Sequence, residues 1–197
     1  MYSVDLRHVA LDSDQLRCLA HPLRSRLLAA LRLEGPATSA GLAARLNTNT
    51  GATSYHLRQL AAVDLIMEDA SLGTGRERYW RAVHDVTNWT ETSFENDPDD
   101  KAAVDWLTGH HLRMVNRWRE DWLGSRMEWP EEWRSAASLG DMRVRLTPDQ
   151  TRAMVAELDS VIERWATDPQ DESAGHASTT ADVFVLLDVF PAHRATL

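Results

Sequence analysis

Apolar residues recur at helical spacing in four successive stretches near the N-terminus. The first stretch begins at Asp12 or Ser13, and it must end by His21 because Pro22 disfavours helical geometry in the residue before it. Pro22 suits the first turn of the second helix, which the Glu-Gly-Pro sequence at residues 34–36 ends. The apolar positions of these two predicted helices are Leu16, Leu19, Ala20, Leu23, Leu27, Leu28 and Leu31.

A third and a fourth helix follow with a short turn between them. Thr38 or Ser39 caps the third helix, residues 47–49 form the turn, and the fourth helix covers residues 50–62. Two helices joined by a turn of about three residues form a helix-turn-helix. The apolar positions of this pair are Leu42, Ala43, Leu46, Thr53, Leu57, Leu60 and Ala61.

The fourth helix has small and hydrogen-bonding side chains on the face opposite its apolar stripe. Asn49 is a good N-cap, and no acidic residue follows in the first turn, so the positive end of the helix dipole is not neutralised. Such an end attracts phosphate. An ordinary surface helix is the alternative for this segment taken alone. The outer-face residues are Thr50, Gly51, Ser54, Tyr55 and Arg58.

The hydrophobic period changes to that of strands after the fourth helix. Residues 65–69 and 76–82 are strand-like, and the loop between them contains two glycines, so a β-hairpin is predicted. Arg76 and Arg78 lie two residues apart and therefore share one face, where they can straddle a phosphate backbone or enter a minor groove. A solvated edge strand blunted by charge is the alternative. Helices followed by such a hairpin make a winged helix-turn-helix.

The segment from Leu16 to Val83 resembles the winged helix-turn-helix regulators of the ArsR/SmtB type. The resemblance depends on four phrases in order, LAHPLRSRLLAAL, SYHLRQL, DLI and GRERYW. It implies a homodimeric repressor of transcription whose recognition helices, residues 50–62, enter successive major grooves of an operator with inverted repeats. The hairpin, residues 65–82, is the wing on the DNA backbone or minor groove. The positions that the resemblance turns toward DNA are Thr50, Gly51, Ser54, Tyr55, His56, Arg58, Arg76 and Arg78.

His56 matches the histidine of the family's S-x-H-L phrase, where local packing or a hydrogen bond to phosphate is favoured over a metal-binding or catalytic role. Asp64 stands where the family has glycine after the recognition helix. Because aspartate tolerates the left-handed conformation better than most residues, a strained but intact turn is expected.

No metal site and no cofactor are predicted. The single cysteine, Cys18, excludes an internal disulfide and a zinc site built on several thiolates. Many ArsR/SmtB proteins sense metals through a Cys-x-Cys pair on the third helix, but the corresponding phrase here, SAGLAARL, has no thiol. His110 and His111, beside Asp105, point about 100° apart on a helix and cannot both ligate one ion in the usual i, i+4 arrangement.

The second half begins with a polar connector, residues 84–98, and a long helix from Asp99 to about Arg126. At about 40 Å this helix is longer than a small domain needs internally, so we expect it to mediate dimerisation. Five tryptophans lie between Trp106 and Trp133. They are either packing anchors between subunits or the lining of a pocket for an aromatic effector. The candidate pocket residues are Trp106, His110, Trp118 and Trp122.

The C-terminal residues predict a small strand-helix-strand module. Residues 141–146 and 183–189 have strand-like patterns, and a helix starting near residue 147 has an apolar stripe. Residues 167–180 form a polar linker that we expect to be mobile. The module resembles, more weakly, C-terminal extensions of actinobacterial regulators with this kind of winged helix. The predicted fold class is therefore mainly α with small β: a winged helix-turn-helix, a long dimerisation helix and this module.

Charge divides the chain near residue 90. The net charge of −9 comes from residues 90–197, with 11 basic and 21 acidic residues; residues 1–89 have 10 arginines and 9 acidic residues. A near-neutral half can present a local arginine face, whereas phosphate would repel the other half. We therefore predict a DNA-binding domain at 1–89 and a dimerisation or effector domain at 90–197.

Other functional classes are less compatible with the sequence. There is no Gly-rich phosphate loop, nucleophile elbow or convincing carboxylate pair, so an enzyme is not expected. No apolar run reaches the roughly 18 to 20 residues that cross a bilayer, and no signal sequence is evident, so a cytoplasmic protein without a membrane partner is expected. The alternative function is a winged helix that binds proteins, without specific DNA binding, through the acidic half.

Overall fold

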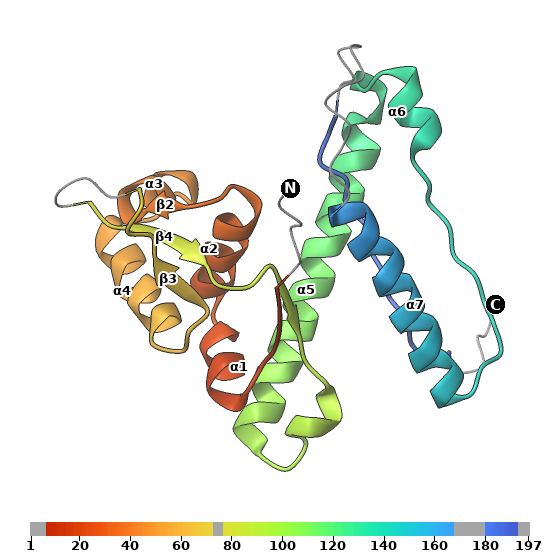
Figure 1. Ribbon diagram of the computed structural model, residues 1–197, viewed down its shortest axis with the longest axis horizontal. Coiled ribbons are helices and arrows are strands. Elements are labelled where there is room, and N and C mark those ends of the chain that lie inside the picture. The colour runs from red at the N-terminus through yellow and green to blue at the C-terminus, as the bar shows by residue number, and fades with distance from the viewer. Residues whose placement is uncertain (1–6, 73–76, 168–179, 193–197) are drawn as a thin grey trace. The chain divides into compact units, whose positions relative to one another are not determined.

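The computed structural model describes residues 7–72, 77–167 and 180–192 and is mainly helical, as predicted (Figure 1). Its contacts divide the chain into two compact units. The first unit ends at Met114 and the second begins at Val115. The candidate DNA-binding residues all belong to the first unit.

Helices α1 (Ser13–Leu19) and α2 (Pro22–Leu33) form where the apolar stripes predict them. Asp12 caps α1 in a reciprocal arrangement: its carboxylate accepts from the Gln15 backbone N–H at 2.8 Å, and the Gln15 side chain accepts from the Asp12 N–H at 3.3 Å. His21 caps α2. Local side-chain chemistry thus sets both starting points.

Helices α3 (Ser39–Arg45) and α4 (Thr50–Ala61) form the predicted helix-turn-helix. Thr38 caps α3, and the Asn49 side chain caps α4 by accepting a hydrogen bond of 2.7 Å from the Ala52 N–H. Satisfying these otherwise unpaired amides fixes where each helix begins.

A three-stranded sheet completes this part of the fold. Strands β3 (Ile66–Glu68) and β4 (Tyr79–Ala82) form the predicted antiparallel hairpin, with Ile66 opposite Ala82. Strand β2 (Ala37–Thr38) pairs with the other edge of β4. Asp64, before β3, has φ +56, so the expected left-handed turn is present. This arrangement of helices and hairpin is a winged helix-turn-helix (Figure 1).

The sequence did not predict a second, two-stranded parallel sheet. Strand β1 (His8–Ala10) pairs with β5 (Val86–Asn88), and η1 (Glu91–Phe94) follows, so the segment interpreted as a polar connector contains regular structure. Three-residue strands are too short to show a hydrophobic period. Arg7 strengthens the pairing, because its guanidinium donates two hydrogen bonds of 3.0 Å to the Asp85 carboxylate.

One hydrophobic cluster holds the first unit together. Leucines from α1, α2, α3 and α4 meet in this cluster. Apolar side chains from the first half of the long helix that begins at Pro98 join them. Burying these side chains supplies the main favourable free energy of folding. Completely buried leucines in the cluster are Leu16, Leu27, Leu42, Leu57, Leu60 and Leu65.

The long helix α5 (Pro98–Ser125) matches its prediction and continues into the second unit. Beyond it lie η2 (Arg126–Glu128) and α6 (Glu131–Ala136), which were not predicted, and α7 (Pro148–Thr167), which was. Thr147 starts α7 in the predicted place. Among the helices of the described ranges, none combines the length and the apolar character that a membrane span requires.

The two predicted strands of the C-terminal module are wrong. Residues 141–146 and 183–189 are described, but neither pairs with another strand. Alternating apolar residues favour a strand only when a neighbouring edge offers hydrogen bonds. Val144 and Val183 are 53% and 66% exposed, so neither reaches a core. Most of the predicted linker, residues 168–179, lies outside the described residues.

Candidate nucleic-acid interface

Helix α4 buries one side and exposes the other. Thr53, Leu57 and Leu60 are fully buried on the apolar side. Tyr55 is 51% exposed, and the other predicted contact residues on the outer face are exposed or half-buried. The structure therefore leaves the outer face of α4 accessible to a large ligand. These outer-face residues are Thr50, Gly51, Ser54 and Arg58.

The N-terminal end of α4 has the polarity expected for contact with an anion. Its first turn holds no acidic residue, and the Asn49 side chain satisfies one of the free amides. The positive end of the helix dipole is therefore uncompensated by charge. One turn later, the Arg58 Nε donates to the Ser54 carbonyl at 3.1 Å, which holds the guanidinium along the exposed side of the helix.

A groove of about 550 Å³ runs beside the outer face of α4. The first residues of α3, the outer face of α4 and the residues around β4 form its walls. The groove brings Arg78 of the wing together with α4 residues that the sequence placed on the same surface. Its lining residues are Thr38, Ser39, Ala40, Thr50, Ser54, Arg58, Glu77, Arg78 and Trp80.

The wing presents both signs of charge. The Nε of Arg78 lies 3.1 Å from Glu68 Oε1, and both side chains are largely exposed. Glu77 also lines the groove, a contribution that the sequence pattern did not indicate because a single acidic residue between two arginines carries no signal of its own. Arg76, one of the predicted contact residues, lies outside the described residues. An exposed ion pair such as Arg78 with Glu68 contributes little free energy, so Arg78 can leave Glu68 for another anionic partner readily.

His56 lies behind the outer face and contacts two other rings. Its ring centroid lies 5.1 Å from that of Tyr55, in an edge-to-face contact. It lies 4.4 Å from the ring centroid of His21, the N-cap residue of α2. Local packing, one of the two roles expected for this residue, is therefore observed. Burial, with the nearby charges of His21 and Arg24, lowers the pKa of His56. No local sequence pattern indicates the contact between the two histidines, because they lie 35 positions apart.

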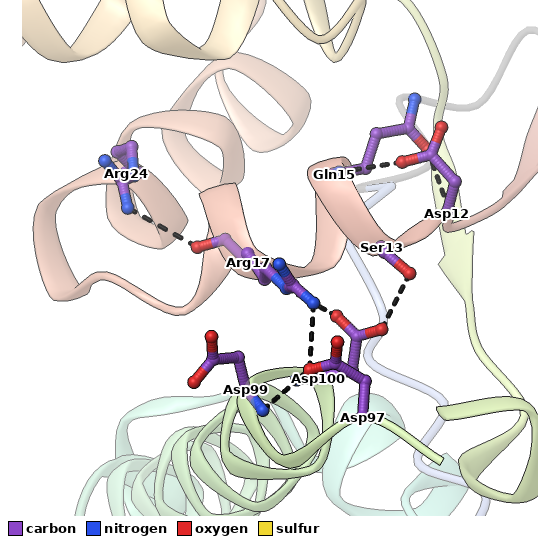
Figure 2. A network of polar contacts seen from close by, with 8 residues as sticks. All are labelled: Asp12, Ser13, Gln15, Arg17, Arg24, Asp97, Asp99 and Asp100. Carbon is purple, nitrogen blue, oxygen red and sulfur yellow. Dashed lines mark hydrogen bonds and ion pairs between the residues drawn. The ribbon is translucent and has the colours of Figure 1, made fainter. Parts of the chain in front are cut away.

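A polar network fastens α1 to the beginning of α5 (Figure 2). The buried Asp100 carboxylate accepts hydrogen bonds from Arg17 Nε at 2.6 Å and Ser13 Oγ at 2.7 Å. Arg17 also reaches Asp97 at 3.0 Å, and Asp97 accepts from the backbone N–H of Asp99 at 2.8 Å. The network fixes the start of α5 against the helix-turn-helix domain, a role for these residues that sequence patterns did not indicate.

The candidate effector-pocket residues fall into two sets along α5. Trp106 and His110 stack at 4.8 Å, with an interplanar angle of 10°, in the first unit. In the second unit, Trp118 stacks on Phe184 at 4.2 Å. The remaining member, Trp122, is 6.5 Å from Trp129. Sequence analysis did not foresee the involvement of Phe184, because nothing in the pattern links positions so far apart.

Within the described ranges, no group of three or more His, Cys, Asp or Glu side chains is placed to hold a metal ion. Cys18 is half-buried, and burial raises the pKa of its thiol. A thiol with a raised pKa is less reactive, because the thiolate is the nucleophile and the metal ligand.

Comparison with known proteins places a helix-turn-helix domain in the part of the chain that the fold defines. The model of a family described as "Helix-turn-helix domain" matches residues 19–69, which contain α2, α3, α4 and the start of the hairpin. The chain thus contains a winged helix-turn-helix domain by both sequence and geometry. No curated protein matches the chain.

Several solved structures are similar to part of the chain. Reduced HlyU of Vibrio cholerae is 20% identical over 50% of this chain and 84% of its own, with a TM-score of 0.33. A possible transcriptional regulator for arsenical resistance is 29% identical over 55% of this chain and 95% of its own, with a TM-score of 0.32. The adhesin competence repressor of Streptococcus pyogenes is 14% identical over 74% and 81%, with a TM-score of 0.32.

Proposed function

We propose that this protein is a homodimeric, sequence-specific transcriptional repressor of the ArsR/SmtB type. The observation that carries the proposal is the outer face of α4: hydroxyl groups and an arginine line a groove shared with an arginine of the wing. This chemistry suits a DNA duplex, which offers phosphates and base edges to such groups. The match of residues 19–69 to a helix-turn-helix domain supports the same class of ligand.

Each side chain of the interface has a proposed role. Ser54 and Tyr55 reach base edges in the major groove, and Arg58 binds a phosphate or a guanine. The N-terminus of α4, at Thr50 and Gly51, faces a phosphate. The wing contacts the backbone or minor groove through Arg78 and, outside the described residues, Arg76. His56 supports this surface from behind.

The acidic half serves dimerisation and responds to an effector. Residues 90–197 contain almost twice as many acidic as basic residues, so this half is unsuited to phosphate. In a dimer, the spacing of the two recognition helices must match the spacing of inverted operator repeats. A small aromatic effector near the α5 tryptophans would shift operator affinity by favouring one spacing. Such a regulator works in the cytoplasm.

The test is binding to the promoter of the protein's own gene, measured against scrambled DNA of the same length at several salt concentrations. We expect tighter binding to the promoter and a linear fall of log affinity with log salt. Equal affinity for both sequences would contradict the proposal. Arg58→Ala and Arg78→Ala should each weaken binding by roughly tenfold, about 1.4 kcal/mol, without changing the oligomeric state.

Arg152→Ala is the matched control, because it removes an exposed arginine from α7 in the second unit. It should leave DNA affinity unchanged. Loss of binding in all three variants alike would indicate that only net charge matters. Unchanged affinity in both interface variants would favour the second candidate, a protein-binding winged helix. The pairing of Arg78 with Glu68, which offsets positive charge on the wing, supports that candidate.

A further inference from the structure

His21 holds the start of α2 through a hydrogen bond that depends on its protonation state. Its Nδ1 accepts from the Leu23 backbone N–H at 3.2 Å. An imidazole nitrogen accepts a hydrogen bond only when it carries no proton. A proton on Nδ1 would therefore remove the cap and place positive charge at the positive end of the α2 dipole.

The same ring contacts the recognition helix. The centroids of His21 and His56 are 4.4 Å apart, with the planes inclined by 37°, and His56 in turn meets the exposed Tyr55 edge to face. The Nδ1 atom of His56 is buried and, among the described residues, has no hydrogen-bond partner. Three rings thus connect the start of α2 with the outer face of α4.

The groups around the two rings oppose added positive charge. From α2, the Arg24 guanidinium acts on both histidines, and its Nε also donates to the Cys18 carbonyl. Cys18 of α1, whose carbonyl binds Arg24, has a thiol whose pKa is raised by burial, so it adds no negative charge to offset Arg24. From α4, Tyr55 contributes a neutral phenol ring. Burial and Arg24 lower the pKa of both His21 and His56, so the pair stays neutral at ordinary pH.

We propose that His21 and His56 form a proton-sensitive joint that positions the recognition helix, so that mild acid weakens specific operator binding. Protonating either ring opposes the contact, because the new positive charge lies near the Arg24 guanidinium, and a second proton would add repulsion between the two rings. The start of α2 loses its cap at the same time. Helix α4 then loses the support that holds Tyr55 toward a base edge. This inference rests on the proposed function.

The direction of the pH effect distinguishes the proposed role of the two histidines from a simple change in net charge. An added proton makes the domain more positive, which strengthens binding to any duplex. The contact between His21 and His56 predicts instead that acidification weakens binding to the specific operator. The informative quantity is therefore the ratio of affinities for promoter DNA and scrambled DNA, measured between pH 8 and pH 5.5 at constant ionic strength.

The test uses the full-length wild type, His21→Asn and His84→Asn. In the wild type we expect the ratio to fall by about twofold or more as the pH approaches 5.5, because the lowered pKa values of both histidines place their protonation at the acid end of this range. Asparagine keeps a cap acceptor but does not titrate, so His21→Asn should retain the ratio at pH 8 and lose most of its pH dependence. His84 is the matched control, since burial also lowers its pKa but Arg32, rather than Arg24, is its main charged neighbour.

The His84→Asn variant should follow the wild-type curve. A constant ratio in the wild type, or an unchanged fall in His21→Asn, would overturn the joint. In a second arm, histidine NMR of the protein without DNA should show the pKa of His56 rising in His21→Asn. If no promoter preference exists at any pH, the proposed function fails, while that NMR shift still supports the coupling. An unmoved His56 titration overturns the inference whether or not DNA binds.

Discussion

Arg17 of α1 and Asp100 of α5 form an ion pair across 83 positions of sequence, with Nε 2.6 Å from Oδ1 (Figure 2). The Asp100 side chain is only 8% exposed, and Ser13 supplies a second hydrogen bond. A buried carboxylate is tolerated only when its oxygens are satisfied in this way. The pair therefore fixes where α5 meets the helix-turn-helix domain.

Asp100→Asn should lower the free energy of unfolding by about 1–3 kcal/mol, because the amide loses charge-assisted bonds to a buried group. Urea denaturation of the full-length protein measures the change. Asp99→Asn is the control: it removes the same charge from the same helical turn, but its side chain is exposed. Equal losses in both variants would show that the ion pair contributes nothing beyond net charge.

Asp64 adopts φ +56 at the end of the helix-turn-helix, in the region that favours glycine. Asp64→Gly should raise the free energy of unfolding by up to about 1 kcal/mol, because glycine relieves the strain but gains entropy in the unfolded chain. Asp64→Val should lower it by about 1–2 kcal/mol. The side chain is exposed, so packing does not complicate thermal or urea unfolding. A valine variant as stable as the glycine variant would contradict this explanation.

The stability of the first unit should depend on acid through Asp85. Hydrogen bonds from the Arg7 side chain hold the pKa of Asp85 below its ordinary value. A depressed pKa contributes stability that is present above the unfolded value, about 3.9, and is lost as pH falls through the folded value. Asp85→Asn should therefore flatten the fall in unfolding free energy below about pH 4.

Asp159→Asn, which removes an exposed carboxylate of α7, provides the comparison for that measurement. Its acid profile should follow the wild type in urea titrations at a series of pH values. If the unfolding free energy of Asp85→Asn fell with pH as steeply as that of the wild type, the bonds between Arg7 and Asp85 would not stabilise the parallel pairing of β1 with β5.

In the second unit, Phe184 should control the environment of Trp118. Their rings stack at 4.2 Å with an interplanar angle of 13°, a contact worth about 0.5–1.5 kcal/mol. In protein labelled with 5-fluorotryptophan, Phe184→Ala should shift the Trp118 fluorine resonance, which Trp118→Phe assigns. Phe190→Ala removes a ring that is 75% exposed and should leave that resonance in place. A shift in the control alone would contradict the stacking.

The sequence by itself determined the helices α1 to α5 and α7 and the two faces of the recognition helix. Those features depend on interactions within a few residues: Asn49 caps α4 through Ala52, and the spacing of Leu57 and Leu60 puts both on the buried side. It also indicated the hairpin and the turn at Asp64, because turn residues and strand periods are local signals. The candidate contact residues on α4 other than His56 share one face for the same reason, whereas the structure places His56 behind that face.

Only the tertiary structure decided which distant segments meet. Arg7 with Asp85, and His21 with His56, are contacts between elements that no local pattern links. The predicted strands at 141–146 and 183–189 show the converse, since a strand requires a partner edge and neither segment has one within the described part of the chain. Helices satisfy their own backbone, whereas sheets, ion pairs and ring contacts depend on how the whole chain packs.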